Sequence, residues 1–332
     1  MKNSYLITGG TGSFGKSFLK SIIESKIKIS RLVIFSRDEF KQSQIEFDFP
    51  KDKYPFLRFF LGDVRDYDRL LNATRGIETV IHAAALKQVP AAEYNPFEAI
   101  KTNIIGAQNV INASVNNGVK KVLALSTDKA CAPINLYGAT KLCSDKLFVS
   151  ANNIIGKKKI SFSVVRYGNV FGSRGSVFNI FNDYKTRGFF PITDKKMTRF
   201  NITLNEATTM VLNILKNSTG GEIFVPKLKS YRIVDLAKAM NEKNKLKLVG
   251  IRPGEKIHEQ MITTSDSLST VEFKNFYAIL PQGNNKLIKQ FLLQNKGKKV
   301  KENFEYSSDK NGKYLSLKEI KALIKDHEKK KL

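Results

Sequence analysis

The chain has 332 residues, of which 42% are hydrophobic and 26% are charged. This composition is typical of a globular protein, and the length suits one large α/β unit with a lesser lobe. No apolar run approaches the roughly 20 residues that a membrane-spanning helix needs, which excludes a membrane-embedded chain. The sequence runs at once into an apolar strand without a leader, so we expect a cytoplasmic protein.

The formal net charge of +26 allows two interpretations. A positive field attracts nucleic acid or an anionic membrane, but here the lysines are scattered along the whole sequence. We therefore interpret the charge as a solvated surface that helps to draw in an anionic substrate, and we expect neither nucleic acid nor membrane as a partner. Cys131 and Cys143 are predicted to be reduced thiols, and no cysteine or histidine cluster has the spacing of a metal site, so we expect no metal.

A glycine-rich turn follows the first predicted strand, at 4–7, and precedes a segment whose apolar residues recur at helical spacing. This context favours dinucleotide binding, because glycines let the backbone approach a pyrophosphate and the helix N-terminus offers free N–H groups to it. The residues of the turn that we expect to bind the cofactor are Thr8, Gly9, Thr11, Gly12, Ser13, Phe14 and Gly15.

The second predicted strand, at 31–35, ends in residues that bear on the choice of cofactor. Ser36, Arg37 and Lys41 suit the additional phosphate of NADP, because charged donors bind phosphate strongly. NADP is therefore favoured, and NAD is the alternative. In that alternative Arg37 and Lys41 are surface cations and Asp38 binds the ribose.

Strands are also predicted at 56–61, 79–85, 121–125 and 160–166, alternating with helical stretches. This order predicts an α/β fold with a doubly wound parallel Rossmann-type sheet, whose ligands lie at the carboxyl ends of the strands. Asp63 can accept from the adenine amino group, and the small alanines leave room for the cofactor. The expected cofactor contacts at these strand ends are Asp63, Val64, Ala83, Ala84 and Lys87.

The clearest catalytic pattern follows the strand at 121–125. Ser126 and Thr127 end this strand, and Tyr137 and Lys141 lie four residues apart at the start of a predicted helix. That spacing puts both side chains on one helix face, where the ammonium can lower the pKa of the phenol for proton exchange with a substrate hydroxyl. We expect Tyr137 and Lys141 to be the redox pair and to contact the cofactor as well.

These motifs together resemble the extended short-chain dehydrogenase/reductase family. Further blocks resemble, more narrowly, the inverting UDP-N-acetylglucosamine 4,6-dehydratases that start pseudaminic acid synthesis, which implies a UDP-sugar substrate. The blocks lie within residues 1–280 and include TGGTGSFG, FSRDE, STDKACAPINLYGATKLCSDKLF, VVRYGNVFGSRGSV, KMTRF and IRPGEKIHE. Tyr137 fits the inverting subgroup, since the membrane-attached retaining relatives commonly carry methionine at this place.

The resemblance also implies a mechanism. After oxidation at carbon 4 of the sugar, Lys129 removes the carbon 5 proton, Asp128 protonates the departing carbon 6 hydroxyl, and NADPH returns its hydride to carbon 6. Carbon 5 is then protonated from the opposite face. The expected catalytic set is Thr127, Asp128, Lys129, Tyr137 and Lys141. In the alternative interpretation, Asp128 merely begins a helix and Lys129 is a solvated lysine.

Substrate contacts are expected mainly after residue 165. The resemblance places the Asn169 region at the sugar nucleotide, a pair of arginines at the diphosphate and Glu255 at the ribose. The expected substrate contacts are Lys87, Asn169, Val177, Arg199, Arg252 and Glu255. Arg166 or Arg174 could exchange roles with the two arginines. Asn201 stands where relatives usually have an aromatic residue, while His82 and His258 are predicted to be ordinary polar histidines.

The predicted organisation is an NADP-binding Rossmann domain over 1–165, a smaller α/β substrate lobe over 166–282 with some segments that return to the core, and a lysine-rich extension over 283–332. Within the extension, a peripheral amphipathic helix is expected at 315–324, followed by a mobile lysine tail. The resemblance implies a homo-oligomer. Two rival functions remain, a nucleotide-sugar 4-epimerase and a non-catalytic regulator that senses NADP or binds nucleic acid.

Overall fold

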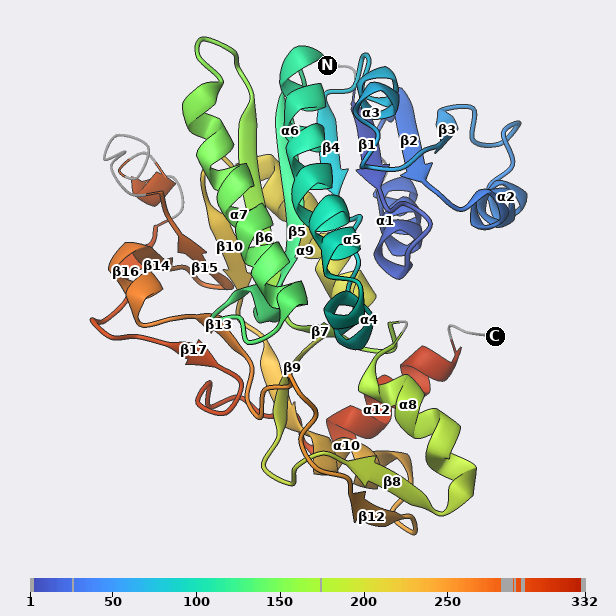
Figure 1. Cartoon of the computed structure of the whole chain (residues 1–332), viewed down its shortest axis with the longest axis vertical. Helices are drawn as coiled ribbons and strands as arrows, with labels where there is room; N and C mark the ends of the chain where they lie inside the picture. The colour runs from blue at the N-terminus through green and yellow to red at the C-terminus, as the bar shows by residue number, and fades with distance from the viewer. Residues whose placement is uncertain are drawn as a thin grey trace.

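The computed structural model describes residues 3–25, 27–173, 175–281, 289, 291–293 and 296–329. A ten-stranded sheet forms the centre of its larger part (Figure 1). In spatial order, the parallel strands are β3 (Leu57–Leu61), β2 (Arg31–Ser36), β1 (Ser4–Thr8), β4 (Thr79–His82), β5 (Lys121–Thr127), β6 (Ser161–Tyr167) and β10 (Ile223–Pro226). Beyond β10 lie the antiparallel strands β15 (Phe276–Ile279), β14 (Thr270–Glu272) and β16 (Lys298–Lys299).

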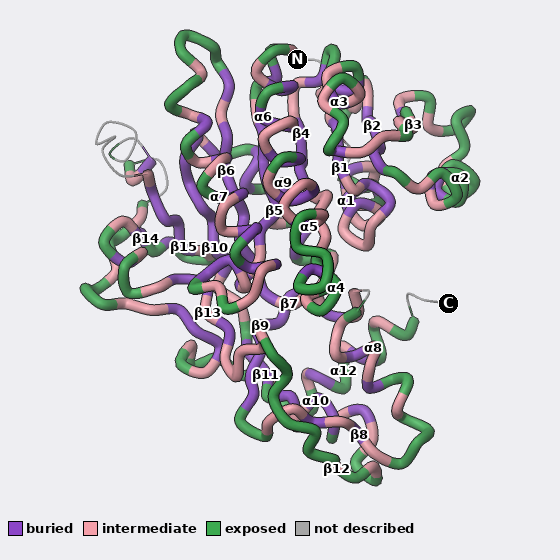
Figure 2. Tube along the Cα trace, in the orientation of Figure 1, coloured by how far each residue is buried: buried purple, intermediate pink, exposed green. Residues whose placement is uncertain are grey.

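Helices cover both faces of this sheet, so its central strands are buried on two sides (Figure 2). One face carries α1 (Ser13–Glu24) and α9 (Leu204–Asn217), and the other carries α3 (Tyr67–Ala73), α6 (Gly106–Asn116) and α7 (Leu136–Ile154). Shorter helices follow the second and fourth strands: α2 (Glu39–Asp48), α4 (Val89–Tyr94), α5 (Pro96–Ile100) and the π-helix η1 (Lys101–Ile105). The doubly wound parallel α/β sheet predicted from the sequence is confirmed.

The fourth strand is shorter than predicted. It ends at His82 instead of residue 85, because the backbone N–H groups of Ala83 and Ala84 turn toward the Thr8 hydroxyl, each at 3.2 Å. His82 itself lies inside the sheet and forms a hydrogen bond of 2.9 Å with the same hydroxyl. Burial lowers the pKa of His82 to about 3, so its ring is neutral.

A smaller α/β lobe lies below the carboxyl ends of the strands in Figure 1. It contains the parallel pair β8 (Phe189–Ile192) and β12 (Lys245–Leu248), with α8 (Val177–Tyr184), α10 (Ile233–Met240) and α12 (Leu317–Lys329). Two small sheets join it to the main sheet: β7 (Asn169–Val170) with β9 (Thr198–Ile202) and β11 (Lys229–Arg232), and β13 (Gln260–Ile262) with β17 (Tyr306–Ser307). The remaining short helices are η2 (Asp128–Ala130), η3 (Lys185–Arg187) and η4 (Ser265–Ser269).

The carboxyl-terminal segment is built into this lobe. The helix predicted at 315–324 is observed as α12, and its Ile320 and Ile324 are buried in one apolar core with Phe190 and Leu236. The lysine tail from 330 onward lies outside the described residues. The predicted domain boundaries stay predictions. Strands β10, β14 and β15 belong to the predicted lobe segment 166–282 but join the main sheet. Within the described ranges, no helix is long and apolar enough to cross a membrane.

Candidate active site

A cleft of about 680 Å³ lies where the carboxyl ends of the parallel strands face the smaller lobe. It brings together most of the residues predicted to bind cofactor or to act in catalysis, from six separate stretches of the chain. The predicted residues that line it are Gly9, Thr11, Gly12, Ser13, Phe14, Ser36, Arg37, Lys41, Asp63, Val64, Ala83, Ala84, Lys87, Thr127, Asp128, Lys129, Tyr137, Lys141 and Asn169.

The glycine turn has the geometry that a dinucleotide needs. Gly9 has a φ of +66°, and a Cβ atom there would lie 2.9 Å from the backbone of Ala84. Gly12 is the N-cap of α1 and lines the cleft. Because no side chain caps this helix, the backbone N–H groups of its first turn are left to bind an anion there. Thr8 and Gly15 do not line the cleft: Thr8 is fully buried beneath the turn, and a Cβ atom on Gly15 would overlap the backbone of Gly10.

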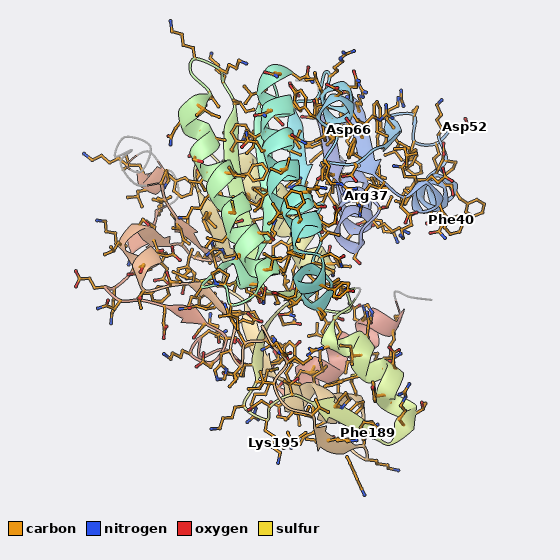
Figure 3. All side chains as sticks on the ribbon, in the orientation of Figure 1. Arg37, Phe40, Asp52, Asp66, Phe189 and Lys195 are labelled. Atoms are coloured by element: carbon orange, nitrogen blue, oxygen red, sulfur yellow. The ribbon has the colours of Figure 1, made fainter. Side chains whose placement is uncertain are left out.

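At the end of β2, charged side chains surround the position predicted for the 2′-phosphate. Arg37 lies between the sheet and α2 (Figure 3), and its Nη1 is 3.5 Å from an Asp63 oxygen. Asp38 caps α2 by accepting from the Lys41 backbone at 2.9 Å, and it also forms an ion pair with the Lys41 ammonium. Although burial alone would raise it, the pKa of Asp63 is lowered, chiefly through hydrogen bonds and charge from Arg65. The Asp63 carboxylate is therefore ionised, and both Asp38 and Asp63 are paired with cations.

Tyr137 and Lys141 lie on the first turns of α7, where Asn135 caps the helix by accepting from Gly138 N–H at 2.8 Å. Both side chains are buried, and the Lys141 Nζ donates to the Leu125 carbonyl at 2.8 Å. Burial raises the pKa of Tyr137 to about 12, against the opposing charge of Lys129. The net shift is therefore upward, and the predicted lowering of this pKa by Lys141 stays a prediction. The cation that acts on the phenol is Lys129, from the preceding turn η2.

Close packing holds α7 against η2. A Cβ atom on Gly138 would overlap the Lys129 carbonyl oxygen, so only glycine permits this approach. Thr127 ends β5, and its hydroxyl forms a hydrogen bond that lowers the pKa of Tyr137 against the effect of burial. The strand end and the helix start therefore present Thr127, Lys129 and Tyr137 to one region of the cleft.

Asp128 and Lys129 form a largely desolvated ion pair. Asp128 has no exposed surface, and its Oδ1 accepts from the Lys129 Nζ at 3.0 Å and from the Thr127 hydroxyl at 2.9 Å. Its Oδ2 is buried without a hydrogen-bond partner among the described residues. Burial raises the pKa of Asp128. The Lys129 side chain is 24% exposed, so it is not a freely solvated lysine, as the alternative interpretation required.

A second carboxylate, that of Glu259, completes this cluster and was missed by the sequence analysis. Its Oε1 lies 3.3 Å from the Lys129 Nζ, and its side chain is behind the cleft instead of lining it. Burial alone would lower the pKa of Lys129, but the carboxylates of Asp128 and Glu259 raise it, so the lysine is an ammonium. Glu259 is the last residue of the IRPGEKIHE block, which was the only signal for it in the sequence.

The predicted substrate residues divide into two groups. Lys87 and Asn169 line the cleft, whereas Arg199, Arg252, Glu255 and Val177 lie outside its lining. The buried Arg199 guanidinium is 3.6 Å from Glu255 Oε1, and Arg252 binds the same carboxylate through two hydrogen bonds, of 2.9 and 3.1 Å. Both predicted diphosphate cations therefore meet at the carboxylate predicted for the ribose.

The remaining predictions concern polar residues around this group. Arg166 is buried and paired with Asp145 at 3.2 Å, while Arg174 lies outside the described residues. Asn201 is buried on β9 in register with Asn169. His258 forms a 2.8 Å hydrogen bond with the Thr198 hydroxyl, as an ordinary polar histidine does. Over the part of the chain that is described, no group of three or more His, Cys, Asp or Glu could hold a metal ion.

Comparison with known proteins agrees with this arrangement. The family described as polysaccharide biosynthesis protein matches residues 5–281. The chain is 53% identical to a UDP-N-acetylglucosamine 4,6-dehydratase (inverting) of Campylobacter jejuni, over 97% of each protein. It is 40% identical to a UDP-glucose 4-epimerase of Rickettsia akari, over 96% of this chain and 94% of that protein.

Among solved structures, the X-ray structure of Pen from Bacillus thuringiensis superposes with a TM-score of 0.87 at 38% identity, covering 98% of this chain and 99% of that one. The fold is therefore shared along nearly the whole chain. The resemblance to inverting UDP-N-acetylglucosamine 4,6-dehydratases expected from the sequence is confirmed. The chain belongs to the polysaccharide biosynthesis protein family.

Proposed function

We propose that the protein is a UDP-N-acetylglucosamine 4,6-dehydratase that inverts carbon 5 of the sugar and uses NADP. The observation that carries the proposal is the Asp128–Lys129 pair, which lies beside Tyr137 in one cleft. Oxidation at carbon 4 needs only the Tyr137 and Lys141 pair. Loss of water needs an additional base and acid, and this pair supplies both.

The chain's own groups fit three proton transfers. Tyr137, in its deprotonated form, takes the proton of the carbon 4 hydroxyl as the hydride leaves carbon 4; the charge of Lys129 and the Thr127 hydroxyl favour that form against burial. The resulting ketone acidifies carbon 5, and Lys129 takes the carbon 5 proton. Asp128 gives a proton to the carbon 6 oxygen, which leaves as water. NADP, when bound, supplies the hydride chemistry at carbons 4 and 6. Carbon 5 then receives a proton on the face opposite to the one it lost.

The base must be neutral before it can accept a proton, although Lys129 is an ammonium in the ion pair. One proton moving from the Lys129 Nζ to the Asp128 carboxylate, 3.0 Å away, gives a neutral amine and a carboxylic acid. Desolvation favours this neutral form, because burial penalises both charges. The pair therefore reaches the base-and-acid state without exchanging a proton with solvent.

The cofactor assignment rests on Arg37, directly after β2, and Lys41, in the first turn of α2, which both line the cleft and can bind a phosphate. In this proposal Asp38 stays engaged as the cap of α2 instead of binding the ribose. The glycine turn and the N-terminus of α1 hold the pyrophosphate. Asn169, Val177, Arg199, Arg252 and Glu255 would contact the UDP-sugar. The absence of a metal, the cytoplasmic location, the homo-oligomeric state and the lack of a nucleic-acid or membrane partner stay predictions.

A nucleotide-sugar 4-epimerase is the second candidate, favoured by the 40% identity to the Rickettsia akari protein. An epimerase returns the hydride to carbon 4 and loses no water. Mass spectrometry of the product from UDP-N-acetylglucosamine separates the two functions. We expect a nucleotide sugar lighter by one water; a product of unchanged mass would exclude dehydration. Absence of any turnover would instead favour the non-catalytic regulator.

A further inference from the structure

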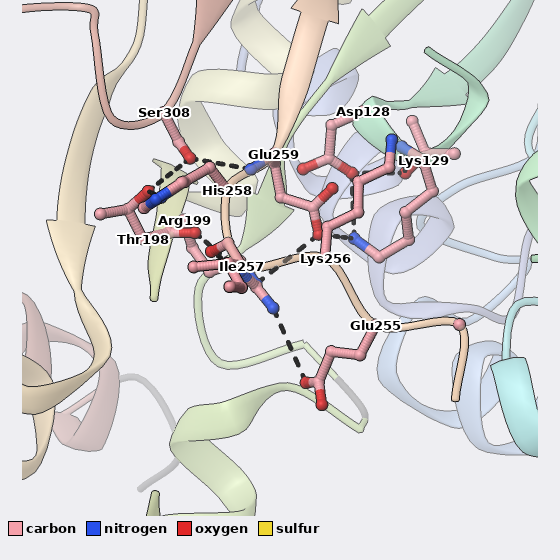
Figure 4. Close-up of polar contacts among 12 residues, drawn as sticks. Asp128, Lys129, Thr198, Arg199, Glu255, Lys256, Ile257, His258, Glu259 and Ser308 are labelled. Atoms are coloured by element: carbon pink, nitrogen blue, oxygen red, sulfur yellow. Dashed lines mark hydrogen bonds and ion pairs between the residues drawn. The ribbon is translucent and has the colours of Figure 1, made fainter. Parts of the chain in front are cut away.

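Glu259 precedes β13 and lies behind the Asp128–Lys129 pair (Figure 4). Only 2% of the residue is exposed. Its Oε1 lies 3.3 Å from the Lys129 Nζ and 3.6 Å from the Arg199 Nε, and its Oε2 is buried with no hydrogen-bond partner among the described residues. Such a carboxylate is costly to bury, so its place against Lys129 calls for a reason beyond packing.

The backbone of Glu259 is fixed by the carboxyl-terminal segment. Glu259 N–H donates to the Ser308 hydroxyl at 2.9 Å, and Ser308 N–H donates to the Glu259 carbonyl at 2.7 Å. The Ser308 hydroxyl also lies 2.6 Å from the Thr198 hydroxyl, which in turn contacts His258. Figure 4 shows this chain of contacts running from Ser308 to the carboxylate that faces Lys129. Two segments distant in sequence, around Thr198 and Ser308, therefore hold Glu259 in one place.

A lysine needs such a fixed point because its four-carbon stem is flexible. Asp128 is the adjacent residue and can hold the ammonium from one side only. Glu259 approaches from a different segment, so the Nζ is held between two carboxylates at 3.0 and 3.3 Å. The 24% of the Lys129 side chain that stays exposed belongs to the cleft lining.

We propose that Glu259 is a positioning residue for the dehydration step: its carboxylate fixes the Lys129 amine beside Asp128 and sets how tightly that pair holds its protons. This inference rests on the roles proposed above for Asp128 and Lys129. Glu259 does not touch the cleft and transfers no proton to the sugar.

The charges around the cluster determine the sign of its effect on pH dependence. Lys129 faces Asp128 and Glu259, with Arg199 on β9 opposing them, and the phenols of Tyr137 and Tyr231 lie nearby. Glu259 faces Lys129, Arg199 and Lys256, which hold its pKa below the ordinary value although burial acts to raise it. Glu259 therefore stays ionised, and its charge raises the pKa of both Asp128 and Lys129.

The active pair carries one proton, so activity falls when the pair gains a second proton at low pH or loses its only one at high pH. Removal of the Glu259 charge should lower the pKa values at which the pair loses its second and its only proton. Both limbs of the pH profile of kcat should then move to lower pH.

The test compares wild type, Glu259→Gln and Glu259→Asp in dehydration of UDP-N-acetylglucosamine across the pH range. For Glu259→Gln we expect both limbs of kcat to move down by about one pH unit or more, since a charge at this distance acts strongly in a desolvated site. At its own optimum, kcat should fall about tenfold while KM changes less than about twofold. Glu259→Asp keeps the negative charge, but its shorter side chain places the carboxylate farther from Lys129. The limbs of its pH profile should therefore lie between those of wild type and Glu259→Gln.

Glu255→Gln is the matched control. Like Glu259, Glu255 pairs with Arg199, but the ion pairs of Lys129 are with Asp128 and Glu259. This variant should raise KM, while both limbs of the pH profile of kcat should stay at their wild-type pH values. Thermal denaturation checks that each variant folds, and Glu259→Asp carries the test if Glu259→Gln does not fold. Limbs of Glu259→Gln and Glu259→Asp that coincide with wild type would overturn the inference. Full turnover by Lys129→Ala would instead overturn the roles of the pair, so the two failures are distinguishable.

Discussion

Asp128 and Lys129 set the chemistry at the scale of single residues. A carboxyl group with no exposed surface and a raised pKa holds a proton more readily than a solvated carboxyl group does, as a general acid must. Lys129 is suited to be its basic partner only because the two groups are 3.0 Å apart and can exchange that proton. In the proposed mechanism, the pair, and not either residue alone, is the acid–base unit.

Replacement of either member should therefore remove dehydration. We expect Asp128→Asn and Lys129→Ala each to lower kcat by about 10²–10⁴-fold, the usual contribution of a general acid or base, while NADP binding stays unchanged. Asp128→Asn is the gentler change, since Lys129→Ala leaves two buried carboxylates facing each other. Steady-state kinetics and cofactor titration by fluorescence provide the measurements. Wild-type turnover in both variants would contradict the mechanism.

The proposed preference for NADP can be tested at Arg37. Arg37→Ala should weaken NADP binding about tenfold or more and leave NAD binding unchanged, because only the 2′-phosphate offers a charged hydrogen-bond partner. Calorimetric titration of both cofactors into wild type and variant measures this. Arg58→Ala, on the neighbouring strand β3 and outside the cleft, is the control. Equal loss of NAD and NADP affinity in Arg37→Ala would show that Arg37 supports the site without selecting the phosphate.

At the scale of elements, the contact between α7 and η2 determines how Tyr137 meets Lys129. Gly138→Ala should push the helix from the turn, because the new methyl group overlaps the Lys129 carbonyl oxygen. We expect a kcat at least about tenfold lower, since small displacements of reacting groups are costly. Ala139→Gly, at an exposed site on the same helix, should cost up to about 1 kcal/mol of stability without affecting kcat. An unchanged kcat in Gly138→Ala would mean that this contact does not position the site.

The same elements indicate what a sequence can predict. The strands β1 to β6 of the main sheet are short, mainly apolar runs, so local pattern located them. The strands β10, β14, β15 and β16 of the same sheet were not predicted. The early end of β4 depends on Thr8 of the neighbouring strand β1, because its hydroxyl accepts from the backbone N–H groups of Ala83 and Ala84. Glu259 reaches Lys129 only through the fold, and the helical spacing of Tyr137 and Lys141 gave no indication that burial and Lys129 would dominate the phenol. Contacts between segments that are distant in sequence could therefore not be predicted from local sequence pattern.

At the scale of the whole molecule, the net charge of +26 should act on the substrate before it binds. A UDP-sugar is an anion, and a positive field raises its encounter rate in a salt-dependent way. We expect kcat/KM to fall several-fold between about 0.01 and 0.3 M salt, with kcat at saturation nearly constant. Initial rates at low and saturating substrate measure both quantities. A kcat/KM that does not change with salt would assign the charge to solubility alone.

The central claim is that this cleft removes water from a UDP-sugar and inverts carbon 5. A proton NMR time course with UDP-N-acetylglucosamine in heavy water tests it most directly, because it follows carbons 4, 5 and 6 together. The account predicts a 4-keto product with a methyl group at carbon 6, deuterium at carbon 5 and the L-arabino configuration. A product that keeps its carbon 6 hydroxyl and is changed only at carbon 4 would contradict the account.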